Sequence, residues 1–99
     1  PPYYRLVYVY LKNRNEILLD LMAQTMAGKL RAIFGNRVLG PDKPPVARVQ
    51  TLFIRKIVVK IEMKAPMARV RELLIQVQKE MVMEDRFKSL IVYYDVDPM

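Results

Sequence analysis

Three segments dense in β-branched and aromatic residues alternate with two segments of helical periodicity, and this order constrains the fold of the chain most. The strand-like segments are residues 3–11 (YYRLVYVYL), 52–62 (LFIRKIVVKIE) and 90–96 (LIVYYDV). Between them, apolar side chains recur at helical spacing over residues 16–34 and 66–85. The chain therefore combines β-strands with two amphipathic helices.

The apolar side chains of each helix fall on one stripe. The first stripe consists of Leu19, Met22, Ala23, Met26, Leu30 and Phe34. The second consists of Val70, Leu73, Leu74, Val77 and Met81. Asn13 is placed to cap the first helix with Glu16 as its capping-box partner, and Gly35 is placed to end it. Pro66 suits the first turn of the second helix.

The stretch between the first helix and residues 52–62 contains three prolines within five residues. Residues 37–41 (RVLGP) are extended and run into Asp42-Lys43-Pro44-Pro45, a composition that excludes a helix and a regular central strand. After the prolines, strand-like sequence resumes at residues 46–50. The order β-α-β-β-α-β predicts an α+β ferredoxin-like sandwich with an irregular Pro-rich second strand. Its four-stranded antiparallel sheet carries both helices on one face.

The length and the ends of the chain bear on domain organisation. Ninety-nine residues suit a single domain, 1–99. The chain begins Pro-Pro without an initiator Met, so we expect a domain excised from a larger protein. No apolar stretch is long enough to cross a membrane and nothing resembles a signal peptide, so we expect a soluble protein without a membrane partner. The absence of cysteine is compatible with a reducing cytosol.

The residue types that most catalytic sites need are missing from the sequence. The chain has no histidine and no cysteine, and no glycine-rich phosphate-binding loop. Asp95 and Asp97 would share one face of a strand, which resembles half of a carboxylate metal site. We favour the alternative that these acids are solvated or paired with Arg37 or Lys60. The sequence thus predicts a non-catalytic chain that holds no metal or other cofactor.

The net charge of +7 is concentrated in the first two thirds of the chain. Residues 1–64 carry twelve bases and four acids, whereas residues 65–99 carry five bases and six acids. Within residues 29–60 the only acid is Asp42, and this asymmetry favours a polyanion such as DNA as the partner. The candidate DNA-binding residues are Lys29, Arg31, Arg37, Lys43, Arg48, Arg55, Lys56 and Lys60. The alternative is a solvated surface that keeps a small domain soluble.

Alternation along residues 52–62 separates two sets of side chains. Lys56 and Lys60 lie on one face; the other face holds Phe53, Ile57, Val59 and Ile61. Six tyrosines lie on the first and last strands, as in RNA-binding sheets that stack bases on aromatic rings. Residues 52–62 lack the glycine-aromatic pattern of those domains, and tyrosine is also ordinary strand material.

Several short motifs resemble the C-terminal end of the PriA (primosomal protein N′) family of bacterial replication-restart helicases. They are residues 37–41 (RVLGP), 44–48 (PPVAR), 57–61 (IVVKI) and 94–98 (YDVDP). Residues 1–6 (PPYYRL) resemble the segment just beyond that family's helicase core. The resemblance extends over essentially the whole chain, and the sequence around FGNRVLGPDKPP is similar to that of Bacteroides-type members.

The resemblance implies a parent protein that is an ATP-driven 3′→5′ DNA helicase acting in replication restart and primosome assembly. The parent's ATP and magnesium site and its zinc-binding cysteines would lie upstream, in a cytoplasmic, nucleoid-associated bacterial protein. In this family the C-terminal domain has a split βαβ fold. It is implicated in contacting forked or single-stranded DNA and the acidic tail of single-stranded DNA-binding protein.

Within this resemblance, Arg69 corresponds to an arginine that meets the carboxylate of that tail, a contact for which a guanidinium is well suited. The next polar position expected one turn later is the apolar Leu73. Arg69 as a solvated first-turn residue is the alternative.

Three hypotheses follow for the chain. The leading one is an accessory DNA- and partner-binding domain of the helicase. The second is an architectural module that packs on the helicase core of the same protein without binding DNA, and the third is a stand-alone RNA-binding module.

Overall fold

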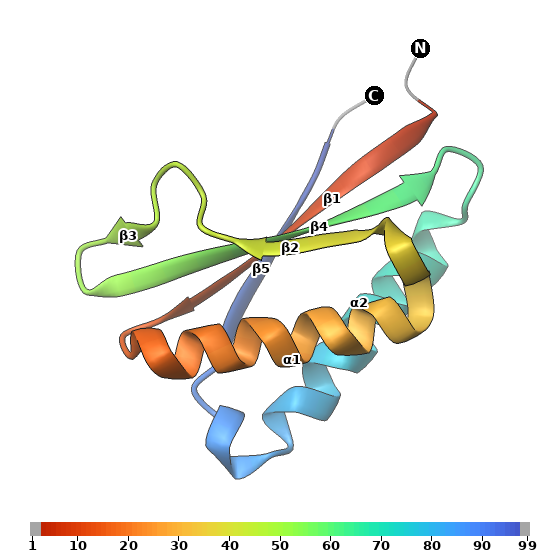
Figure 1. The fold of residues 1–99 in the computed structure, drawn as a ribbon. Helices are drawn as coiled ribbons and strands as arrows, with labels where there is room; N and C mark the ends of the chain where they lie inside the picture. The colour runs from red at the N-terminus through yellow and green to blue at the C-terminus, as the bar shows by residue number, and fades with distance from the viewer. Residues whose placement is uncertain (1–2, 98–99) are drawn as a thin grey trace.

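A computed structural model describes residues 3–97 as a single open sheet with two helices on one side (Figure 1). The strands are β1 (Tyr4–Asn13), β2 (Val38–Asp42), β3 (Arg48–Val49), β4 (Leu52–Glu62) and β5 (Ile91–Val96). The helices are α1 (Glu16–Phe34) and α2 (Met67–Val82), and short 3₁₀ turns lie at Gly35–Arg37 and Asp85–Phe87. Pro1, Pro2 and Pro98, which belong to the sequence motifs above, lie outside the described residues.

The sheet has the order β2-β4-β1-β5, and every pairing is antiparallel. The two long central strands, β1 and β4, pair along their whole lengths, from Tyr4 opposite Glu62 to Asn13 opposite Phe53. Because the crossing helices both pack on one face, the other face is open (Figure 1). The predicted ferredoxin-like α+β sandwich is confirmed, with one additional short strand, β3.

The Pro-rich second strand is irregular, as predicted, and it is divided into two pieces. β2 pairs with β4 through Val38 and Leu39, and the register then shifts before Asp42 meets Lys56. After the prolines the chain returns to the same partner as β3. Gly40 allows the shift because its φ is +96° and a Cβ there would lie 2.9 Å from the Lys56 carbonyl oxygen.

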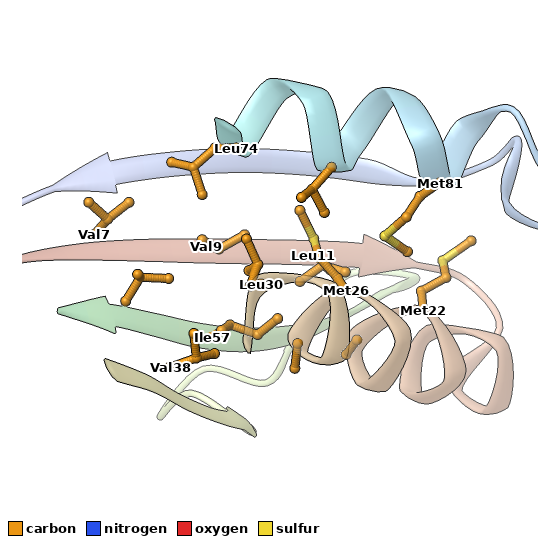
Figure 2. Close-up of a cluster of buried hydrophobic side chains, with 14 of the residues drawn as sticks. Val7, Val9, Leu11, Met22, Met26, Leu30, Val38, Ile57, Leu74 and Met81 are labelled. Carbon is orange, nitrogen blue, oxygen red and sulfur yellow. The ribbon is translucent and has the colours of Figure 1, made fainter. Parts of the chain in front are cut away.

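The core fills the space between the sheet and the helices (Figure 2). Val7, Val9 and Leu11 of β1 are fully buried and point at the helices, as strand alternation requires. The methionines Met22 and Met26 of α1 are also fully buried, as expected for side chains that fill irregular gaps. The predicted stripes form this core, with Phe34 and Leu73 only partly buried.

The start of α1 differs from the prediction. The N-cap is Asn15, whose side-chain oxygen accepts from the Leu18 backbone N–H at 3.0 Å. Asn13 is the last residue of β1 and is buried, and its side-chain amide donates to the Ser89 hydroxyl at 3.1 Å. The prediction of Asn13 as the cap is wrong because the pairing of β1 with β4 extends the strand to that residue.

The other helix ends lie close to their predicted positions. Gly35 ends α1 with a positive φ of 64°, which favours glycine. Pro66 is the N-cap of α2 rather than a residue of its first turn, and α2 ends at Val82, a few residues before the predicted 85. No helix within residues 3–97 has the length and apolar character needed to span a membrane.

Candidate nucleic-acid interface

The open face of the sheet carries the side chains that alternate with the core residues of β1, β4 and β5. Since Val9 and Leu11 point at the helices, Tyr10 points away from them. The register sets Tyr10 between Lys56 of β4 and Tyr93 of β5. Tyrosines and lysines from three separate segments therefore meet on this face.

Three of these tyrosines form a contiguous row, which we call the tyrosine row: Tyr8, Tyr10 and Tyr93. The ring centroids of Tyr10 and Tyr93 are 4.8 Å apart with an interplanar angle of 14°, and those of Tyr8 and Tyr10 are 6.4 Å apart. The Lys56 Nζ lies 5.5 Å from the centroid of Tyr8, and the Lys12 Nζ lies 4.7 Å from that of Tyr93. Each end of the row is thus covered by an ammonium group at cation–π distance.

A second aromatic group lies toward the N-terminal end of β1. The Lys60 Nζ is 5.8 Å, and the Arg37 guanidinium carbon 5.6 Å, from the ring centroid of Tyr4. Arg37 is also ion-paired with Glu62, and this hydrogen bond raises the pKa of Arg37. Tyr4 and Tyr10 are six residues apart on one strand, a spacing of about 20 Å along the face.

The phenols of the sheet divide between its two faces. Burial raises the pKa of Tyr10, with further contributions from Tyr93 and Asp95, so its hydroxyl keeps its proton at neutral pH. Tyr94 lies on the helix side, where its hydroxyl donates to the Gln78 side-chain oxygen at 2.7 Å. Burial raises the pKa of Tyr94 to about 12. Tyr94 is therefore not part of the open face.

Two of the eight predicted DNA-binding residues, Lys56 and Lys60, lie on the open face as alternation required. Arg37 reaches the edge of this face at Tyr4. Lys43 and Arg48 lie on the connection between β2 and β4 and are exposed. Arg48 does not point to the open face: its guanidinium carbon lies 5.0 Å from the ring centroid of Phe53, on the helix side of the sheet. The other four residues lie on the open face or at its border.

Arg55 does not lie on this face. Its side chain is 3% exposed on the helix side, where it bonds Asp20 at 2.6 Å and Glu16 at 2.8 Å, both on α1. Burial lowers the pKa of Arg55, but the hydrogen bonds to the two carboxylates outweigh this and the pKa is raised. Arg55 therefore joins β4 to α1, and its guanidinium is not available to a phosphate on the open face. Strand alternation could have shown this, because Arg55 shares its face with the core residue Ile57.

Lys29 and Arg31 also lie on the helix side, both on α1. The Lys29 Nζ pairs with a Glu80 carboxylate oxygen of α2 at 3.5 Å. The Arg31 guanidinium donates to the Gly40 carbonyl oxygen. Both side chains link α1 to its neighbours and are separated from the tyrosine row by the sheet.

Lys12 is the residue of this interface that the charge distribution did not indicate. It lies outside the basic segment 29–60 but shares the open face with Tyr8 and Tyr10 by alternation along β1. Its contact with Tyr93 depends on the pairing of β1 with β5, which brings together residues about eighty positions apart.

The predicted partner-binding residue Arg69 is exposed in the first turn of α2 and bonds Glu72 at 3.1 Å. Two residues later, Arg71 lines a pocket of about 250 Å³ between α2 and β5. The apolar wall of this pocket includes Leu74, Ile75 and Val96. Arg71 forms no ion pair with any of residues 3–97. No signal in the sequence distinguishes Arg71 from Arg69.

The acids at the end of β5 do not assemble into a cluster. Asp95 lies on the open face opposite Tyr8, and the Asp97 backbone N–H donates to the Leu6 carbonyl oxygen at 2.8 Å. Among the described residues no group of three or more potential ligands is placed to hold a metal ion. Neither acid pairs with Arg37 or Lys60 in this part of the chain, since Arg37 bonds Glu62 instead.

No protein-family model matches the chain, and no curated protein matches it.

Proposed function

We propose that the open sheet face binds DNA, and that the chain is the accessory DNA- and partner-binding domain of a replication-restart helicase of the PriA type. The observation that carries the DNA-binding proposal is the tyrosine row with Lys12 and Lys56 at its ends. The motifs shared with the PriA family support the choice of parent. ATP hydrolysis, magnesium and zinc would then belong to the upstream part of that helicase.

The arrangement provides both interactions that single-stranded DNA needs. An unpaired base can stack on a tyrosine ring, and the lysine displaced from that ring can pair with the adjoining phosphate. Neither interaction identifies a particular base, so binding is independent of sequence and weakens with salt. Forked DNA offers such unpaired segments next to a duplex.

A titration of the chain with single-stranded and forked DNA at low and high salt tests this proposal. The chain contains no tryptophan, so its intrinsic fluorescence reports on tyrosine alone. We expect binding at low salt to be accompanied by quenching of tyrosine emission, because bases stack on the row. Preference for single-stranded RNA over DNA would instead support the RNA-binding alternative.

Reversal of two charges on the open face can be compared with reversal of two charges elsewhere on the domain. The double variant Lys56→Glu, Lys60→Glu should abolish binding at moderate salt, because both ammonium groups lie on the open face. The control Lys79→Glu, Lys88→Glu changes the net charge equally on α2 and the segment that follows it, away from the open face. Equal loss in both variants would contradict the assignment to this face, and no binding by the unaltered chain would favour the architectural alternative.

A second binding function is favoured by the pocket beside Arg71. An apolar side chain followed by a terminal carboxylate matches the apolar wall of this pocket and the Arg71 guanidinium, which has no ion-pair partner within residues 3–97. We therefore assign the acidic-tail contact to Arg71 in preference to Arg69. Arg71→Ala should weaken binding of an acidic peptide that ends in a free carboxylate, whereas Arg69→Ala and an amidated peptide serve as controls. A greater loss with Arg69→Ala would reverse the assignment.

A further inference from the structure

The Pro-rich connection between β2 and β4 rises on the side of the sheet opposite the helices (Figure 1). Its residues line a hollow together with Tyr10 and Tyr93 of the tyrosine row. It has a volume of about 410 Å³. Tyr10, Ile54 and Tyr93 form its floor, and the connection supplies a wall that includes Pro44, Pro45 and Val46. The stacked pair of rings therefore forms part of both the row and the hollow.

The wall of the hollow leaves apolar side chains uncovered. Val46 is 62% exposed and Val49, which also lines the hollow, is 47% exposed. The proline rings restrict φ at Pro44 and Pro45, which limits the conformations that the connection can adopt. A flat apolar group could be held between this wall and the two phenol rings.

We propose that this hollow receives a single unpaired nucleobase at one end of the DNA segment bound along the open face. The inference rests on the proposed function, since the hollow continues the same surface. A base has apolar faces that match prolines and phenols, and polar edges that the hydroxyls of Tyr10 and Tyr93 can meet.

The surrounding charge favours a nucleotide over an apolar peptide side chain. The Lys12 ammonium lies 4.7 Å from the ring centroid of Tyr93, the Lys56 ammonium lies 5.5 Å from that of Tyr8, and Lys43 is exposed on the connection itself. Asp42 and Asp95 are the acids of this region, opposite Lys56 and Tyr8 in the register. The net charge of the side chains around the hollow is therefore positive, which favours the phosphate that follows a buried base.

The position of the hollow predicts which base occupies it. The connection stands at the Tyr10–Tyr93 end of the row, where β4 begins and β1 ends, and the Tyr4 group lies beyond the Tyr8 end, about 20 Å from Tyr10. A strand that follows the row therefore meets the wall at one of its ends. Only one position of a short bound oligonucleotide should enter the hollow.

An abasic-site scan tests this inference. The probe is a short thymidine oligonucleotide in which one base at a time is removed while the phosphates remain, and affinity is measured by fluorescence anisotropy. Removal of the base at one terminal position of the bound segment should weaken binding by at least about fivefold, as expected for loss of a stacked base. Removal at a position outside the bound segment should have no effect.

Substitutions in the wall of the hollow test whether the effect of base removal arises there. Val46→Trp fills the hollow, and the double variant Val46→Ala, Val49→Ala opens its wall. Both substitutions are at exposed positions, so the fold should persist. In each variant the ratio of affinities for the intact and the abasic oligonucleotide should fall toward one. The control Val82→Trp, at a partly exposed site on α2, should keep the ratio of the unaltered chain.

The outcomes separate the two proposals. If the unaltered chain binds none of the oligonucleotides, both the DNA-binding face and the base-binding hollow are overturned. If the intact oligonucleotide binds but every abasic position costs the same, or the wall variants keep the full ratio, only the hollow is overturned. The hollow would then be left to an apolar side chain of a protein partner.

Discussion

The salt dependence of the proposed DNA binding can be calculated from the cations on the open face. Lys12, Lys56 and Lys60 point to this face and form no ion pair with any described residue, whereas Arg37 is neutralised by Glu62. Each phosphate contact contributes about −0.7 to the slope of log K against log salt for single strands, so three contacts give a slope of about −2. The affinity should fall about twentyfold between 50 and 200 mM salt.

Neutralisation of one lysine at a time provides the test. Each of Lys12→Gln, Lys56→Gln and Lys60→Gln should reduce the slope to about −1.4, and the Lys56→Gln, Lys60→Gln double variant should reduce it to about −0.7. The double variant should then lose only about threefold in affinity over the same range. Anisotropy titrations of a labelled thymidine oligonucleotide at four salt concentrations measure these slopes. The control Lys29→Gln removes a cation that is paired with Glu80 behind the sheet and should leave the slope at about −2.

This calculation is refuted if the three variants and the control change the slope alike, because the slope would then depend on the net charge of the domain and not on where each lysine lies. A slope that stays at about −2 in the double variant would show that other cations make the contacts.

Other variants test the structural roles assigned above. Arg55→Met should leave the salt slope unchanged and lower the free energy of unfolding in urea by about 1–3 kcal/mol, because charge-assisted hydrogen bonds to Asp20 and Glu16 are lost while both carboxylates can return to water; a reduced slope would restore Arg55 to the DNA contacts. Gly40→Ala should destabilise the domain by about 1–3 kcal/mol in the same assay, because its φ is +96° and the new Cβ would meet the Lys56 carbonyl oxygen. The control Gly28→Ala, in open space on α1, should stabilise it by about 0.5–1 kcal/mol, and similar effects of the two alanines would contradict the reasoning. The stability of the unaltered domain should be constant below pH 10 with respect to Tyr94 and should fall as the pH rises from 10 toward 12, because the folded pKa of about 12 exceeds the ordinary value of 10.0. The loss should be about 1–2 kcal/mol, given the partial exposure of the ring, and Tyr94→Phe should remove this component of the pH profile.

The local features of the fold could be predicted from the sequence because each depends on neighbouring residues. Helical spacing located α1 and α2, and the strand predicted at residues 52–62 coincides with β4. Alternation assigned Lys56 and Lys60 to the open face. The same rule places Arg55 on the helix face, whereas charge alone groups the basic residues of segment 29–60 without regard to the face on which each lies.

The features that were not predicted depend on contacts between distant segments. The cap of α1 is Asn15 because Asn13 is held in β1 by Phe53 of β4 and by Ser89 beyond α2. The Lys12–Tyr93 contact requires the register of β1 with β5. The apolar pocket lined by Arg71, on which its proposed preference over Arg69 rests, requires the packing of α2 against β5. None of these features can be predicted from the sequence of a single segment, because each depends on how two distant segments pair or pack.

The pairing of lysines with tyrosines is compatible with both a solvated sheet face in the free domain and the binding surface proposed above. In the free domain, Lys56 and Lys12 cover the ends of the tyrosine row through cation–π contacts, which contribute only about 0.5–1 kcal/mol each at exposed sites. A base that takes the place of an ammonium group gains about 1–3 kcal/mol of stacking. The displaced lysine keeps its charge and pairs with the phosphate of the same nucleotide. Because the contact that is lost is weaker than the two that replace it, each lysine–tyrosine pair would favour the bound nucleotide in the proposed complex, and salt would weaken only the phosphate part of the exchange.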